Sequence, residues 1–160
     1  MNYTIETVLL VEDDENDVLF LRRAFEKADT EISLQVATSG QQAVDYLAGN
    51  AEYGDRARFP IPRLIFLDLK LPGQTGMEVL KWIRQQPALC GVEVIVLSSS
   101  NQPVDVAEAY QLGANSYLMK PSAPDELVRV ARAVNDYWFK LDQFPTVLGT
   151  VRADDAGVAA

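Results

Sequence analysis

Acidic, hydroxyl and ammonium side chains follow four short apolar segments of this chain, each directly after its segment ends. In chain order they belong to Glu12 and Asp13, to Asp68, to Ser98 and to Lys120. Burying an ionised carboxylate without a partner is costly, so Asp68 at the end of an apolar run requires partners nearby. Several carboxylates in one pocket raise each other's pKa unless a cation lies among them, and Mg²⁺ prefers such oxygen ligands. These residue types favour a divalent-cation site at which Asp68 acts as a nucleophile toward phosphorus.

The apolar segments alternate with segments of helical periodicity. We expect strands at residues 8–11, 34–37, 64–67, 92–97 and 116–119, and helices at about 15–28, 39–49, 75–86, 103–113 and 123–141. Short apolar strands that alternate with helices are typical of a parallel sheet covered on both faces. The predicted fold class is therefore α/β, a doubly wound five-stranded parallel sheet with five helices. In the strand order 2-1-3-4-5, the second strand lies at an edge and the carboxyl ends of the other four form one cluster.

Length and composition predict one ordinary globular domain. The 160 residues are 48% apolar and 23% charged, which fits a single hydrophobic core. We place the domain at residues 1–144 and expect residues 145–160 to form a flexible C-terminal tail.

Charge and residue usage exclude several function classes. The net charge of −9 argues against nucleic-acid and anionic-membrane surfaces, and no apolar run approaches the roughly 20 residues of a membrane span. The acidic N-terminus lacks the features of a signal peptide and Cys90 is the sole cysteine, so we expect a cytoplasmic protein. The absence of histidine removes Ser-His and Cys-His nucleophile pairs and histidine-ligated zinc.

Four sequence motifs together resemble the receiver domains of two-component response regulators. In chain order the motifs are VLLVEDD, LIFLDLKLPGQTG, VIVLSSS and LGANSYLMKP. Each is weak alone, but the ordered set is specific, and the resemblance covers about residues 6–142. It implies a flavodoxin-like receiver fold and a phosphoacceptor signalling domain, which is not an enzyme beyond catalysing its own phosphorylation and dephosphorylation.

The resemblance also implies a metal site and a phosphoacceptor. Asp68 would accept a phosphoryl group from a sensor histidine kinase. Glu12, Asp13, Asp68 and the backbone carbonyl of Lys70 would bind Mg²⁺, for which Mn²⁺ can substitute. Lys70 is charged where many receivers carry smaller or neutral residues, which leaves the lifetime of the acyl phosphate open.

Further implied roles concern the response to phosphorylation. Ser98 would hydrogen-bond the phosphoryl group and Lys120 would pair with it, so that Asp68, Ser98 and Lys120 form the reacting set. Ser98 and Tyr117 would act together as the switch. The signal would leave through the surface of the fourth helix, fifth strand and fifth helix.

Two features narrow the resemblance to the single-domain regulators that are paired with bacterial phytochrome kinases: the long loop AEYGDRARFPIP and the ending DYWFKLDQFP. A bacteriophytochrome is therefore the candidate kinase. Three adjacent aromatic residues cannot all face inward, so we expect Trp138 in the core and Tyr137 or Phe139 in a homodimer interface. Local burial of this whole segment is the alternative.

Three other functions compete with this interpretation. An aspartate-based phosphohydrolase usually carries a second acid two residues after the nucleophile, where this chain has Lys70. A nucleotide-binding module would need a glycine-rich phosphate loop after a strand, and none is present. A receiver that serves as a scaffold without phosphorylation would not need the full acidic set.

Overall fold

A computed structural model describes residues 5–141 of the chain. Five parallel strands form one sheet in the order β2-β1-β3-β4-β5, which confirms the predicted fold class. The strands are β1 (Glu6–Val11), β2 (Ile32–Ala37), β3 (Leu64–Leu67), β4 (Glu93–Ser98) and β5 (Ser116–Met119). The helices are α1 (Glu15–Lys27), α2 (Gly40–Ala48), α3 (Gly76–Gln85), α4 (Pro103–Gln111) and α5 (Pro124–Val134).

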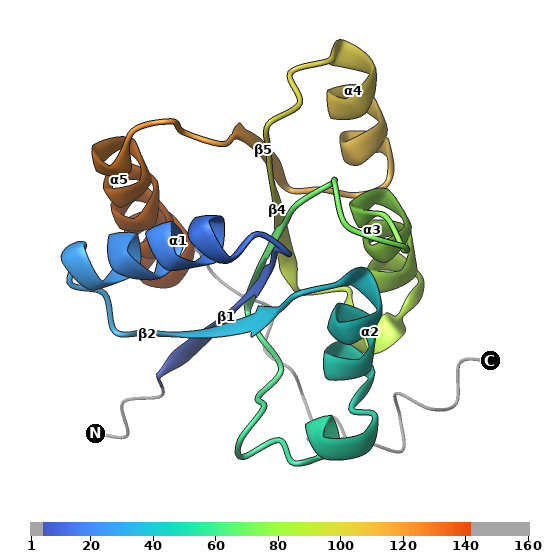
Figure 1. Cartoon of the computed structure of the whole chain (residues 1–160). Coiled ribbons are helices and arrows are strands. Elements are labelled where there is room, and N and C mark those ends of the chain that lie inside the picture. The colour runs from blue at the N-terminus through green and yellow to red at the C-terminus, as the bar shows by residue number, and fades with distance from the viewer. Residues whose placement is uncertain (1–4, 142–160) are drawn as a thin grey trace.

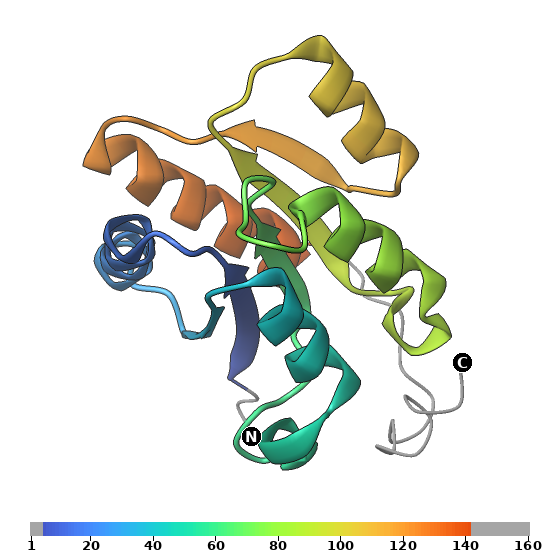
Figure 2. The same ribbon diagram turned by 45° about the vertical axis from the view of Figure 1, so that its right-hand side comes forward.

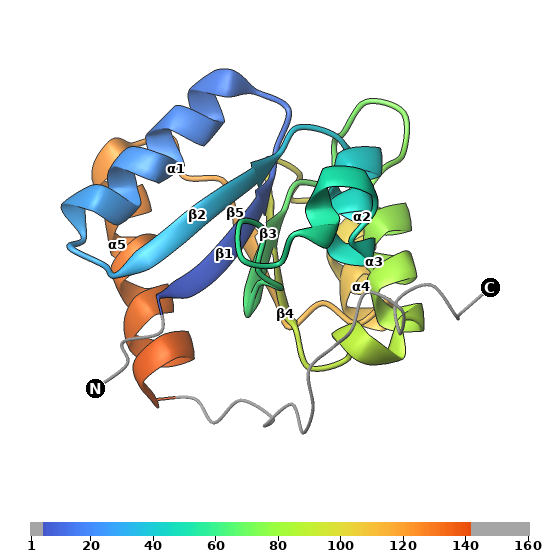
Figure 3. The ribbon, with the colours of Figure 1, turned by 90° about the horizontal axis from the view of Figure 1, so that it is seen from below.

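The sheet lies between two helix layers, with α1 and α5 on one face and α2, α3 and α4 on the other (Figures 1 and 3). Side chains alternate between the faces along each strand, because successive residues of a strand point to opposite sides. Phe66, for example, packs under α1 and α5, whereas Ile65 and Leu67 pack under the other three helices. This two-sided burial explains why the central strands are apolar at every position.

Local sequence signals set the helix starts that follow the strands. Asp14 caps α1 by accepting hydrogen bonds from the backbone N–H groups of Asn16 and Asp17. Thr75 and Glu78 form a capping box at the start of α3. The loops after β1, β3, β4 and β5 lie at the same end of the sheet because the strands are parallel (Figure 2).

The long loop between α2 and β3 is packed in place. It begins with a 3-10 helix, η1 (Ala51–Gly54), and Tyr53 and Phe59 stack around Tyr46 of α2. Arg56 donates hydrogen bonds to the carbonyls of Tyr46 and Leu47, which satisfies acceptors at the end of α2. Specific contacts thus hold an unusually long connection.

The C-terminal helix differs from the single helix expected at residues 123–141. The regular α-helix ends at Val134, and the chain continues as a π-helical segment, η3 (Asn135–Leu141). A separate short 3-10 helix, η2 (Pro87–Leu89), lies between α3 and β4. The wider π turn allows the adjacent residues Trp138 and Phe139 both to pack against the α1–α5 core. The expected tail at residues 145–160 lies outside the described residues. No helix among residues 5–141 has the length and hydrophobicity to cross a membrane.

Two glycines near Asp68 allow a test of how tightly the loop after β3 is packed. A Cβ atom at Gly76 would lie 2.2 Å from the carbonyl oxygen of Asp68, whereas one at Gly73 would meet nothing within 4 Å. We expect Gly76→Ala to lower the free energy of unfolding by about 2 to 3 kcal/mol through overpacking. Gly73→Ala should cost only about 1 kcal/mol, the strain of its positive φ of 73°. Urea unfolding measures both, and equal losses would contradict the close packing at Gly76.

Candidate functional site

Three parallel strands, β1, β3 and β5, bring charged groups to one end of the sheet. Glu12 directly follows β1, Asp68 follows β3, and Lys120 follows β5. β1 pairs with β3, and β4 lies between β3 and β5. Ser98, the last residue of β4, accepts a backbone hydrogen bond of 2.8 Å from the N–H of Lys120. The strand order therefore gathers residues that are more than a hundred positions apart in the chain.

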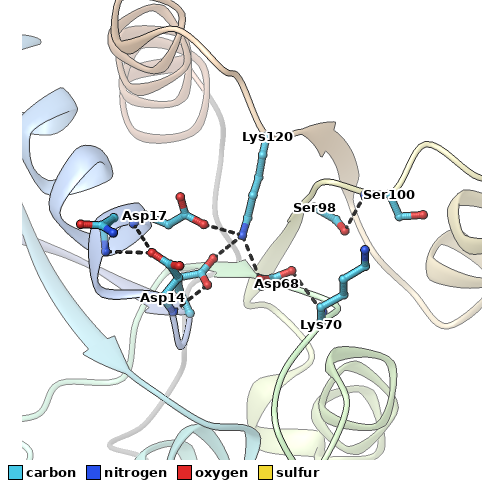
Figure 4. Close-up of polar contacts among 9 residues, drawn as sticks. Asp14, Asp17, Asp68, Lys70, Ser98, Ser100 and Lys120 are labelled. Carbon is cyan, nitrogen blue, oxygen red and sulfur yellow. Dashed lines mark hydrogen bonds and ion pairs between the residues drawn. The ribbon is translucent and has the colours of Figure 1, made fainter.

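The ammonium group of Lys120 joins three carboxylates (Figure 4). Its Nζ lies 2.6 Å from Glu12 Oε2, 2.9 Å from Asp17 Oδ2 and 2.9 Å from Asp68 Oδ2. An ammonium has three N–H donors, so these three acceptors use them all. The side chains of Glu12 and Asp68 are only 3% and 6% exposed, whereas that of Asp17 is 42% exposed. Lys120 thus supplies the charge that two buried carboxylates require.

Burial and pairing shift the protonation of this group in opposite senses. Burial raises the pKa of Glu12 to about 7, although the hydrogen bonds from Lys120 and from the backbone of Asp14 act to lower it. Burial acts to lower the pKa of Lys120, but hydrogen bonds to Glu12, Asp68 and Asp17 outweigh it and raise that pKa above its usual value. Lys120 is therefore a firmly charged ammonium in a pocket that holds excess negative charge.

Three carboxylates of the pocket have a geometry that suits a divalent cation. One oxygen each from Glu12, Asp13 and Asp68 lies within 4.8 Å of the others. Asp13 is exposed, so the group is open to solvent on its side. Oxygen-only ligands, of which several are carboxylates, are typical of Mg²⁺ and Mn²⁺ sites. The residues present fit the predicted metal.

Lys70 lies on the other side of Asp68 from Lys120. Its backbone N–H donates a hydrogen bond of 3.1 Å to Asp68 Oδ1, and its side chain extends on the Ser98 side of the pocket (Figure 4). Metal ligation by the Lys70 carbonyl stays a prediction.

Ser98 and Tyr117 are connected through Ser100. The buried hydroxyl of Ser98 accepts a hydrogen bond of 3.2 Å from the N–H of Ser100, and the carbonyl of Ser100 accepts one of 2.8 Å from the hydroxyl of Tyr117. The Ser100 hydroxyl also donates to Asp105 in the first turn of α4. Ser100, in the loop between β4 and α4, therefore forms hydrogen bonds with both predicted switch residues, Ser98 and Tyr117. Their role in switching stays a prediction.

The two residues predicted for a dimer interface lie in different surroundings. Tyr137 is 56% exposed, whereas Phe139 packs on the core of its own chain with the Arg63 guanidinium 6.0 Å from its ring centroid. Trp138 packs on the same core, as expected. Of the predicted pair, Tyr137 is the one available to a partner.

Two residues of the site were not predicted from the sequence. Asp17 pairs with Lys120, and Ser100 connects Ser98 with Tyr117. Acidic residues are common in the first turn of a helix because they interact favourably with the helix dipole. The residue type of Asp17 therefore did not indicate an ion pair with Lys120. Ser100 acts through its backbone as well as its hydroxyl, which its residue type does not indicate.

Fold and site together define a doubly wound α/β domain with an acidic pocket at the carboxyl end of its sheet. The model of the response regulator receiver domain family matches residues 8–132. The chain belongs to the response regulator receiver domain family, whose members are phosphoacceptor signalling domains of two-component systems.

Known relatives cover nearly the whole chain. FilR2 of Methanothrix harundinacea, described as a probable methanogenesis regulatory protein, is 35% identical over 86% of this chain and 86% of its own length. The response regulator Rcp1 of Synechocystis is 31% identical over 88% of this chain and 93% of its own, and its Mn²⁺-bound structure aligns with a TM-score of 0.77. The phosphorylated cyanobacterial phytochrome response regulator RcpA is 29% identical, aligns with a TM-score of 0.81, and covers 89% of this chain and 100% of its own. The chain is thus of single-domain size and close to phytochrome response regulators.

Lys120 provides a test of the charge balance in the pocket. We expect Lys120→Met to tighten Mn²⁺ binding by about tenfold, because it removes a competing unit charge that is worth roughly 1 to 4 kcal/mol at about 4 Å. Isothermal titration calorimetry on the folded proteins measures the change, and Lys81→Met, an exposed lysine of α3, is the matched control. Unchanged or weaker binding in Lys120→Met would contradict the competition.

Proposed function

We propose that this protein is a stand-alone response regulator of the cytoplasm that accepts a phosphoryl group on Asp68 from a histidine kinase. The observation that carries the proposal is the position of Asp68, 2.9 Å from the Lys120 ammonium and within the carboxylate group that suits Mg²⁺. Family membership supports it, because receiver domains are phosphoacceptors.

The proposed reaction is in-line displacement at phosphorus. An Asp68 carboxylate oxygen forms a bond to phosphorus while the bond from phosphorus to the donor's leaving group breaks, and the leaving group departs with its electron pair. Mg²⁺, held by Glu12, Asp13 and Asp68, would supply charge neutralisation for the phosphoryl oxygens. Lys120 would donate a hydrogen bond to one of these oxygens, and the Ser98 hydroxyl would donate to another.

The proposed signal leaves through the surface formed by α4, β5 and α5. Ser100 links the Ser98 hydroxyl to Tyr117 on β5 and to Asp105 on α4. A Ser98 hydroxyl that turns toward a phosphoryl group would alter its contact with the Ser100 N–H. We infer that Ser98 and Tyr117 transmit the effect of phosphorylation to this surface through the loop that joins β4 to α4.

The relatives supply the proposed kinase partner. RcpA is a phytochrome response regulator, and this chain resembles both RcpA and Rcp1 over almost its full length. We propose a phytochrome-type histidine kinase as the phosphoryl donor. Red or far-red light acting on such a kinase, followed by phosphotransfer to this protein, tests the pairing.

The acceptor role predicts a specific chemical product. Incubation with acetyl phosphate and Mg²⁺ should add the mass of one phosphoryl group, labile to base, and release acetate. Asp68→Asn should abolish this gain because an amide oxygen is a poor nucleophile, and Asp125→Asn, an exposed aspartate of α5, should retain it. Intact-mass spectrometry with peptide mapping measures both. The absence of a mass gain would overturn the proposal. Sustained release of inorganic phosphate, which would show that this protein is an aspartate-based phosphohydrolase, would also overturn it.

Tyr137 is the proposed contact of a homodimer through the C-terminal helical region. We expect Tyr137→Ser to weaken self-association by about tenfold, the ~1 to 2 kcal/mol loss of a partly buried aromatic contact. Analytical ultracentrifugation at several concentrations, with and without acetyl phosphate, measures it. Val104→Ser removes an exposed apolar residue of α4 and serves as the control. A wild-type protein that stays monomeric, or an effect of Val104→Ser alone, would contradict an interface at Tyr137.

A further inference from the structure

The third partner of Lys120 comes from a helix, whereas the other two follow strands. Asp17 lies in the first turn of α1, and its backbone N–H is fixed by a 3.0 Å hydrogen bond to the side chain of the N-cap, Asp14. Its carboxylate reaches across to Lys120 Nζ at 2.9 Å. The N-terminus of α1 is therefore attached to the end of β5 by a direct ion pair.

Asp17 differs from the other two carboxylates in what else it can bind. Glu12 and Asp68 belong to the group of oxygens that suits a divalent cation, and Asp17 does not. Asp68 is also the proposed phosphoacceptor. The carboxylates of Glu12 and Asp68 therefore have a second proposed use beside their contact with Lys120, whereas the carboxylate of Asp17 lies outside the cation group.

Three donors and three acceptors leave little freedom to the ammonium group. When Glu12 and Asp68 engage other groups, Lys120 would keep a single fixed partner. A flexible four-carbon side chain without such a partner would spread over several rotamers, at a cost in reactive geometry.

We propose that Asp17 is a positioning residue, which holds the Lys120 ammonium beside Asp68 while the phosphoryl group is transferred. This inference rests on the proposed function. Asp17 does not touch the reacting atoms and acts through Lys120 alone. Its role in the unphosphorylated protein is the same ion pair, so it can be observed without metal or phosphate.

The kinetic test measures phosphorylation by acetyl phosphate at saturating Mg²⁺. Asp17→Asn should lower the maximal rate constant by about 3- to 10-fold, well below the ~100-fold that a 1 Å misplacement can cost, because Asp17 is partly solvated. Glu15→Gln removes an exposed acidic residue from the same helix turn, away from the ion pair, and should leave the rate within about twofold.

The conservative variant Asp17→Glu should restore at least half of the lost rate. A glutamate at this helix position often bonds to the backbone N–H of the N-cap residue. Here the N–H of Asp14 already donates to Glu12 Oε1 at 3.1 Å. The longer carboxylate is therefore left to bind Lys120.

A spectroscopic readout tests the ion pair in the protein without metal. In ¹⁵N-lysine-labelled protein, the hydrogen-bonded ammonium of Lys120 should give a slowly exchanging ¹H–¹⁵N signal, assigned by its loss in Lys120→Met. Asp17→Asn should broaden this signal beyond detection, and Glu15→Gln should preserve it.

The outcomes separate this inference from the proposed function. A wild-type protein without a mass gain at Asp68 overturns both. With normal wild-type phosphorylation, a rate in Asp17→Asn that equals or exceeds wild type overturns the positioning role. An equal loss in Glu15→Gln, an Asp17→Glu variant as slow as Asp17→Asn, or an unchanged Lys120 signal in Asp17→Asn also overturns it.

Discussion

The ammonium group of Lys120 is the interaction on which the site depends. Two carboxylates, on Glu12 and Asp68, are buried at the end of an apolar sheet, where an unpaired charge would cost several kcal/mol. One positive charge placed between them offsets this cost and fills all three of its hydrogen-bond donors. Lys120 can do so only if β5 runs parallel to the central strands and ends at the same edge. The charge pairing therefore constrains the strand order, and the strand order creates the pocket.

The backbone around Asp68 is closely packed. Gly76 lies so close to the carbonyl of Asp68 that the start of α3 and the end of β3 form one packed unit. The capping box at Thr75 then orients α3 from that contact. The backbone that carries Asp68 therefore has little freedom to move away from the other carboxylates. A positively charged partner stabilises the ionised carboxylates in this arrangement.

The sequence predicted the strands and most of the pocket because the signal was local at each strand, whereas the strand order came from the general topology of doubly wound sheets. An apolar run followed by one polar residue identifies both a buried parallel strand and the side chain at its carboxyl end, as with β3 and Asp68. The ion pair of Asp17 could not be found in this way, since it depends on how α1 turns after its cap. The π-helical end of α5 was also missed, because helical periodicity does not distinguish a stripe at residues 123–141 from two segments with different turns. Trp138 and Phe139 decide that difference by their packing, which is a tertiary property.

The charge count of the pocket links the cation to the acceptor chemistry. Glu12, Asp13, Asp17 and Asp68 bring four carboxylates, and Lys70 and Lys120 bring two ammonium groups. The raised pKa of Glu12 reflects its burial, and the nearby Asp68 charge also acts in this direction. Under the proposed function, a phosphoryl group replaces one negative charge by about two, which adds to the excess. A divalent cation cancels much of it, so bound cation and phosphoryl group must each increase the affinity of the pocket for the other, by the reciprocity of linked equilibria. An acidic pocket that would repel phosphate by itself is therefore selective for a phosphoryl group that binds together with a divalent metal ion.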